Sequence, residues 1–293
     1  MTWLTEPLSH PFFLYGLLAG VLGGALCGLV GVYVVLRRMS YIGHGLSHAI
    51  FGGAAVALIL QWNFYLFAGA WGLLSALLIN GVSRRRKVGA DAAIGVVTTA
   101  SFAVGVVLIS SVHSFEVNLE ALLFGNILGV TVEQLWVLAG VCLVTLALIL
   151  LRYRQLLFAT FDPEAADAYG VSSRAADALF AVIIAATVVA TMRVLGVTLI
   201  AATIVVPAVI ARLVTDSFAR MLVISTAIGA IAGALGMYVS YYVDTPPGAD
   251  IVLILAGVFV IVYAGTALLG RRRLQMLGTV DTHAEAGAAI DLD

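Results

Sequence analysis

Two histidines, His44 and His48, stand four residues apart in the stretch RRMSYIGHGLSHAIFGG (37–53), which is otherwise mostly apolar after its two arginines. On an α-helix this spacing puts both imidazoles on one face, close enough to share one metal ion. Neutral imidazole binds zinc, copper, iron and nickel, and a divalent ion usually takes one or two further ligands. The alternative is a pair of histidines at a membrane surface that hydrogen-bond to carbonyl groups. Either way, the element that carries them is predicted to be a helix.

A carboxylate is the expected third ligand, and Asp244 is the preferred candidate. It precedes Pro246, Pro247 and Gly248, which break a helix and can leave a carboxylate turned toward the interior of a membrane protein. In the alternative, DTPPG is an ordinary outward-facing turn that Asp244 caps. Asp244 and the histidines fall near opposite ends of their segments, so a broken or re-entrant segment would have to bring them together. A loop at 113–126 adds His113, Glu116 and Glu120, which suit metal capture or partner docking, although a plain solvated loop is the simpler interpretation.

The composition indicates an integral membrane protein. Hydrophobic residues make up 62% of the 293 residues and charged residues 11%, against roughly 25% charged residues in a soluble domain. The sequence has no GxxxxGK[ST] motif, so it is not expected to hydrolyse ATP itself. The basic blocks lack interleaved aromatic residues, which argues against a nucleic-acid partner. We expect one transmembrane domain over 1–273 and a disordered cytoplasmic tail over 274–293.

The apolar runs predict eight or nine membrane-spanning helices in an all-α fold. They cover residues 12–36, 42–60, 64–82, 92–112, 131–151, 177–193, 195–214, 220–243 and 250–269. The sixth and seventh could form one broken or re-entrant element, which would leave eight crossings. With nine crossings nearly all arginines and lysines fall on one side, and only Arg193 falls on the other. Positive charge marks the cytoplasmic side, so the carboxyl terminus is predicted to be cytoplasmic.

Two cytoplasmic connections differ from short loops. The first, FDPEAADAYGVSSRAAD (161–177), is acidic, and its Pro-Glu start suits the first turn of a short helix. In the second, at 205–222, Pro207 interrupts an apolar run and is followed by Arg212, Asp216 and Arg220 at helical spacing. This second segment could lie across the cytoplasmic face, or it could be a solvated turn between two helices.

Three blocks together resemble the permease subunits of bacterial ABC importers for zinc, manganese and iron(II) ions. The first block, LRRMSYIGHGLSHAIFGGAAVAL, is similar to the family's Arg-Arg-Met-Ser motif followed by Gly-Asp-x-Leu-x-His. The second, FDPEAADAYGV, is similar to its Asp-x-Glu-x-Ala-x-x-x-Gly pattern. The third extends from LGVTLIAATIVVPAVIARLV through YVSYYVDTPPGADIVLILAG. The resemblance covers roughly residues 12–270.

The resemblance implies a compact form of the permease fold found in vitamin-B12 and siderophore importers. It also implies an assembly of two copies of this chain, two cytoplasmic ABC ATPase subunits and an extracytoplasmic metal-binding protein in the bacterial inner membrane. By the same analogy, the segment from Pro207 to Arg220 would couple the permease to the ATPase. His48 matches the family's histidine, His44 occupies the position of its aspartate, and Asp244 best matches its later carboxylate.

The expected function is therefore ATP-driven import of a divalent metal ion by alternating access, with no resident cofactor and no enzymatic activity in this chain. A histidine in place of an aspartate replaces an oxygen ligand by a nitrogen ligand, which shifts the preference away from manganese and toward zinc, with manganese and iron(II) as the other candidates. The first alternative is an ATP-independent transporter in which His44, His48 and Asp244 relay protons. The second is a subunit that binds metal without passing it.

Overall fold

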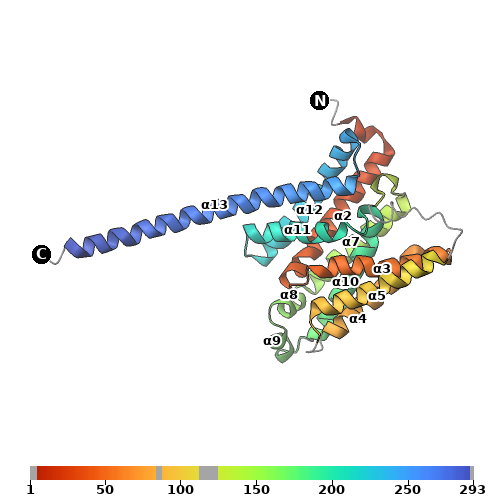
Figure 1. Ribbon diagram of the computed structural model, residues 1–293, viewed down its shortest axis with the longest axis horizontal. Helices are drawn as coiled ribbons and strands as arrows, with labels where there is room; N and C mark the ends of the chain where they lie inside the picture. Colours follow the sequence, from red (N-terminus) through yellow and green to blue (C-terminus); the bar gives the residue numbers. More distant parts are fainter. Residues whose placement is uncertain (1–4, 84–87, 112–124, 291–293) are drawn as a thin grey trace.

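The computed structural model describes residues 5–83, 88–111 and 125–290. Every regular element in these ranges is a helix, which agrees with the predicted all-α fold. The elements in chain order are η1 (Pro7–Ser9), α2 (Pro11–Leu36), α3 (Tyr41–Ile59), α4 (Phe64–Ser83), α5 (Ala90–Ser110), η2 (Ile127–Gly129), α7 (Val132–Leu151), α8 (Tyr153–Phe161), α9 (Pro163–Ala168), α10 (Ser173–Leu195), α11 (Ile200–Val214), α12 (Phe218–Val243) and α13 (Pro247–Ile290). Figure 1 shows them gathered into one bundle, from which α13 extends.

Eight helices in the described part of the chain are long and apolar enough to cross a membrane. They are α2, α3, α4, α5, α7, α10, α12 and α13. Helix length therefore supports eight crossings, the lower of the two predicted counts. The seventh predicted run forms α11, which has only 15 residues. At about 1.5 Å per residue such a helix covers about 22 Å, less than the roughly 30 Å of a hydrocarbon core.

Helix α2 lies at the centre of the bundle because small residues let its neighbours approach closely. Gly20 and Gly24 face Gly233 and Gly229 of α12, and a Cβ atom at Gly24 would overlap the Gly229 carbonyl group. One turn further, the Ser225 hydroxyl donates a hydrogen bond of 2.6 Å to the Gly28 carbonyl. The residue numbers of the contacting positions decrease along α12 as they increase along α2, so the two helices are antiparallel.

Helix α10 is also antiparallel to α2. Arg37, which follows α2, pairs with Asp177 near the start of α10, whereas Gly23 in the middle of α2 faces Leu195 at the end of α10. Since α10 and α12 run in the same direction, the chain must return between them. Helix α11 and its short flanking segments make that return. The chain therefore changes direction as often as a protein with nine crossings, although α11 is too short to span the membrane alone.

Helix α13 forms the last described element of the chain. The composition predicts a disordered tail over 274–293, whereas α13 continues as a helix to Ile290. Alanine and glutamate within residues 283–289 have high helix propensity, which favours this continuation.

Candidate metal site

His44 and His48 lie on the open side of α3. Their ring centroids are 4.6 Å apart with the planes inclined at 74°, as the i, i+4 spacing predicts. Gly43, Leu46 and Ser47 on the other sides of the helix are buried, whereas His44 is exposed and His48 is half-buried. The two imidazoles are therefore accessible although α3 as a whole is one of the most buried spans.

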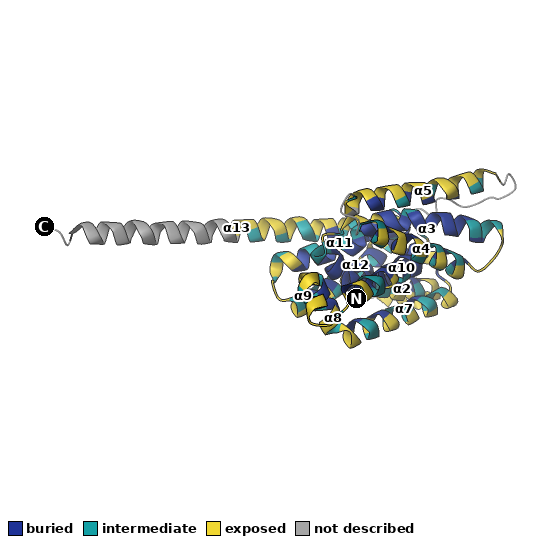
Figure 2. Ribbon diagram, turned by 90° about the horizontal axis from the view of Figure 1, so that it is seen from below, coloured by how far each residue is buried: buried dark blue, intermediate teal, exposed yellow. Residues whose placement is uncertain are grey.

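The pair opens into a cavity of about 500 Å³ between α3 and α5, which we call the histidine cavity. Helix α5 is mostly exposed and covers the more deeply buried α3 (Figure 2). Glycines on α3 let α5 come close: Gly45 faces Ile94 and Thr98, and Gly52 faces Gly105. The Ser101 hydroxyl then joins the two helices by donating to the Ala49 carbonyl at 2.7 Å. The residues that line the cavity are Tyr41, His44, Gly45, His48, Asp91, Ile94, Gly95, Thr98, Thr99 and Phe102.

The two ends of the histidine cavity differ in chemistry. Phe102 forms one end, where its ring meets His48 edge-on at 5.5 Å between centroids and also contacts Phe51 at 5.1 Å. Tyr41 and Asp91, both exposed, lie at the other end. The cavity therefore joins an aromatic end within the bundle to a polar end beside the first turns of α3 and α5.

Asp91 is a lining residue that the sequence analysis missed. It stands in the first turn of α5, where an acid is ordinarily explained by the helix dipole. A signal was present, because Asp91, Gly95, Thr98 and Phe102 recur at helical spacing along one face. That pattern predicts a shared face, although it does not say which helix the face meets.

The structure does not bring Asp244 to the histidines. Asp244 ends α12 in a left-handed conformation (φ 57°), and its amide donates to the Ser240 carbonyl at 2.9 Å. The last turns of α12 pack against Phe13 at the start of α2 through Tyr238 and Tyr241, whereas α3 begins just after the other end of α2. The turn after Asp244 leads directly into α13 at Pro247 and forms no re-entrant segment, so Asp244 stays at the opposite end of the bundle from Tyr41.

Within the described ranges, no group of three or more histidine, cysteine or acidic side chains is placed to hold a metal ion together. The histidine pair alone supplies two ligands. A divalent ion held there would take its remaining ligands from water, from a second copy of the chain or from a docked partner.

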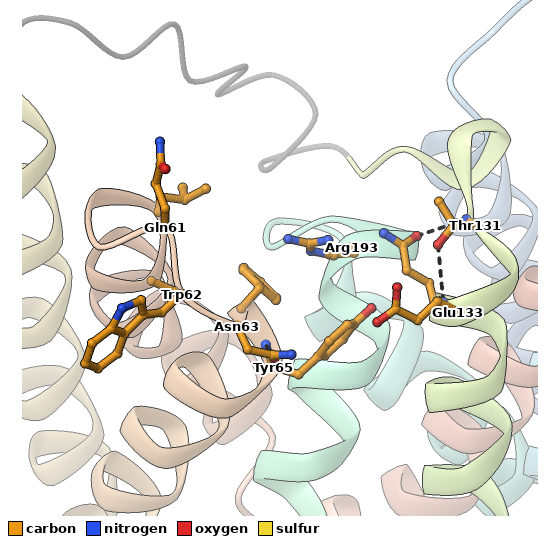
Figure 3. A pocket seen from close by; sticks show the side chains of 11 residues that line it. Gln61, Trp62, Asn63, Tyr65, Thr131, Glu133 and Arg193 are labelled. Atoms are coloured by element: carbon orange, nitrogen blue, oxygen red, sulfur yellow. Dashed lines mark hydrogen bonds between the residues drawn. The ribbon is translucent and has the colours of Figure 1, made fainter.

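A second cavity, of about 490 Å³, lies at the bundle end where α10 finishes. The Arg193 guanidinium stacks over the Phe64 ring at 4.0 Å, and Tyr65 from α4 and Glu133 from α7 point toward each other below it (Figure 3). Thr131 and Gln134 form a capping box at the start of α7. The lining has one carboxylate, no imidazole and a fixed cation, a set that does not suit a metal ion. The sequence-predicted residues His113, Glu116 and Glu120 fall outside the described part of the chain.

The predicted coupling residues lie in and around the turn between α11 and α12. Pro207 is buried within α11, Arg212 and Asp216 form an exposed ion pair at 3.6 Å, and Arg220 is exposed in the first turn of α12. Only three residues separate α11 from α12, so this segment contains no separate helix lying across the surface. The segment consists of the end of α11, a short turn and the start of α12, and its coupling role stays a prediction.

The short helices α8 and α9 form the other connection at this end of the bundle, and Arg37 joins α8 to the core. Its Nε donates to the Thr160 hydroxyl of α8 at 3.1 Å, and its Nη1 donates to Asp177 of α10 at 2.7 Å. The guanidinium also lies 4.5 Å from the centre of the Phe180 ring. Burial lowers the pKa of Arg37 and the Asp177 carboxylate raises it; the group remains a cation. A movement of α8 would thus reach α2 directly.

Comparisons with known proteins agree on the family. Residues 9–266 match the ABC 3 transport family. The manganese transport system membrane protein MntC of Halalkalibacterium halodurans is 35% identical over 256 residues, which cover 87% of this chain and 88% of the relative. The chelated iron transport system membrane protein YfeC of Yersinia pestis is 34% identical over 256 residues, 87% of each chain.

Solved structures agree with the fold. The structure of PsaBC from Streptococcus pneumoniae in complex with Fab matches with a TM-score of 0.81 and 32% identity, over 89% of this chain and 94% of the matched chain. An inward-facing metal-chelate type ABC transporter matches with a TM-score of 0.67 over 86% of this chain and 85% of the other. At 18% identity this second likeness concerns the fold alone.

Proposed function

Because this chain belongs to the ABC 3 transport family, we propose that it is the membrane-spanning permease of an ATP-driven bacterial importer that moves a divalent transition-metal ion into the cytoplasm. The observation that carries the proposal is the pair His44 and His48, which opens into a cavity between two membrane-spanning helices. Imidazoles are costly within a membrane and are kept there for function. Two of them at metal-sharing distance on one helix face supply a site for a passing cation.

The ligand chemistry favours zinc as the cargo, because both protein ligands are borderline nitrogen donors. The names of the relatives refer instead to manganese and chelated iron. Availability and the remaining ligands can override the type of donor. We therefore treat zinc as the first candidate and compare it directly with manganese and iron(II).

The proposed mechanism is alternating access by two copies of the chain. An extracytoplasmic metal-binding protein delivers the ion, and the histidine pairs hold it while the path is closed toward both sides. The site needs to bind only moderately, because an ion held as tightly as structural zinc would not leave again. Asp244 lies at the end of the bundle away from Tyr41, so we assign it to the entry side of the path.

Separate cytoplasmic ATPase subunits would drive the cycle. The proposed contact surface includes the exposed Arg212, Asp216 and Arg220 beside Pro207. The α8–α9 connection offers a second surface at the same end, since Arg37 ties α8 to α2 and α10. We place this end and the carboxyl terminus in the cytoplasm of a bacterial inner membrane.

Uptake by the complete importer tests this function. The permease is reconstituted in vesicles with its ATPase and metal-binding protein, and ATP-driven uptake of radioactive Zn²⁺, Mn²⁺ and Fe²⁺ is compared for the parent, His44→Ala and His48→Ala. Loss of uptake by about tenfold or more is expected for both variants, while assembly with the ATPase persists. His10→Ala is the control, because His10 is exposed at the start of α2 and does not line the cavity. Normal uptake by both cavity variants would refute the proposal.

A further inference from the structure

We propose that Asp91 is a second metal station, which receives the ion from the histidine pair on its way to the cytoplasm. The inference rests on the proposed function and adds a residue and an order of events to it. Asp91 is the one carboxylate that lines the histidine cavity in the described structure. Neither the histidine spacing nor the family resemblance points to it.

The packing of α3 on α5 sets the order of the groups along the cavity. Gly45 of α3 faces Ile94 and Thr98 of α5, His48 contacts Phe102, and Gly52 faces Gly105. Residue numbers rise together on the two helices, so the helices are parallel. Asp91, one turn before Ile94, is therefore level with Tyr41, one turn before Gly45.

An ion moving along the cavity from Phe102 would meet His48, then His44, and then Asp91. The end with Tyr41 and Asp91 is also the end at which Arg37 lies, only four residues before Tyr41. Arginines concentrate on the cytoplasmic side of membrane proteins. Asp91 thus stands at the exit of the cavity and not at its entry.

Asp91 binds the ion after the histidine pair and not together with it, because in the described structure the three side chains are not placed to bind one ion together. Among the residues that the structure describes, none forms an ion pair or a hydrogen bond with the Asp91 carboxylate. The hydroxyls of Thr98 and Thr99 donate to the Gly95 carbonyl at 3.2 and 2.7 Å. Their oxygen lone pairs remain for a cation or its water beside the histidine pair.

A carboxylate at the exit lowers the energy of a cation that leaves the imidazoles, because opposite charges attract. The competing explanation is that Asp91 only favours the positive end of the α5 dipole. That explanation predicts an effect on stability and none on transport. The two can be separated because Glu133 occupies the same kind of position, the first turn of α7, without lining the histidine cavity.

The experiment compares Asp91→Asn, Asp91→Glu and Glu133→Gln in the reconstituted importer, with His44→Ala and His48→Ala alongside. Three quantities are measured: ATP-driven uptake of radioactive Mn²⁺ and Zn²⁺, equilibrium binding of the same ions to the purified permease, and melting temperature. Asp91→Asn is expected to lower the maximal uptake rate by about tenfold and to leave binding to the histidine pair unchanged. Asp91→Glu should restore most of the uptake, and Glu133→Gln should match the parent.

Normal uptake by Asp91→Asn would overturn the second station while leaving the histidine site intact. A loss of uptake that Asp91→Glu does not restore, or one that follows a lower melting temperature, would also overturn it. Normal uptake with a lower melting temperature would support the dipole explanation. If His44→Ala and His48→Ala both transport normally, the proposed function itself fails. The two failures are therefore distinguishable.

Discussion

Removing the Arg37 guanidinium should destabilise the permease, and the structure allows the size of the effect to be worked out. Arg37→Met keeps an unbranched apolar stem over the Phe180 ring but deletes the bonds to Asp177 and Thr160. The Arg37 side chain is 8% exposed and that of Asp177 is 27% exposed. The deletion thus leaves a carboxylate that is largely buried without its charged partner.

Breaking a fully buried ion pair costs about 3–5 kcal/mol. Two features place the expected cost lower. Asp177 keeps some contact with water, and the Nη2 of Arg37 is buried without a hydrogen-bond partner in the described structure, so the parent already carries an unsatisfied group. We expect a loss of about 2 kcal/mol, which lowers the melting temperature by about 3 °C for a chain of 293 residues.

The assay is thermal unfolding of the purified permease in detergent, monitored by loss of the monodisperse protein. Arg38→Met is the matched control, because Arg38 is the exposed neighbour and loses the same charge. The double variant Arg37→Met/Asp177→Leu should recover much of the loss, since no unpaired charge remains. An Arg37→Met melting temperature equal to that of Arg38→Met would refute the reasoning.

Two further predictions concern the α2–α12 contact and the aromatic end of the cavity. Gly24→Leu should prevent α12 from closing on α2, because its Cβ overlaps the Gly229 carbonyl group, and little folded protein is expected on size-exclusion chromatography; Gly140→Leu, at a site with open space, should behave as the parent. Phe102→Ala should remove the ring that meets His48 and raise metal flux without ATP, measured in vesicles that lack nucleotide. An unchanged nucleotide-free flux would mean that Phe102 does not close the path.

The sequence predicted the family and the helical bundle, and both are confirmed. Apolar length and composition decide whether a segment can cross a membrane, and these properties are local. The spacing of His44 and His48 is local too, because four residues on one helix set the separation of two rings. That part of the site was therefore accessible without any knowledge of helix packing.

The rest of the candidate site depended on contacts between helices. Asp244 was predicted as a third ligand, yet its place follows from the antiparallel packing of α12 on α2, which no single segment encodes. Asp91 was missed for the converse reason, since only the glycine contacts of α3 reveal that α5 is its neighbour. Close approach through Gly45 and Gly52 is a property of the pair of helices.

The arginines support the proposed orientation through contacts that are independent of the apolar pattern. Arg37 bonds to Thr160 and Asp177, so the end of α2 meets the α8 connection and the start of α10. The Tyr153 ring contacts Phe218 at 5.6 Å, which brings the connection after α7 to the start of α12. The end of α11 joins them, because Ala211 packs with Val32 and Met221.

One end of the bundle thus gathers Arg37, Arg38, Arg152, Arg154, Arg174, Arg212 and Arg220. Arg193 stands at the far end of α10, where it stacks on Phe64. A distribution this uneven is the one that positive charge takes on the cytoplasmic side, and it requires α11 to return the chain between α10 and α12.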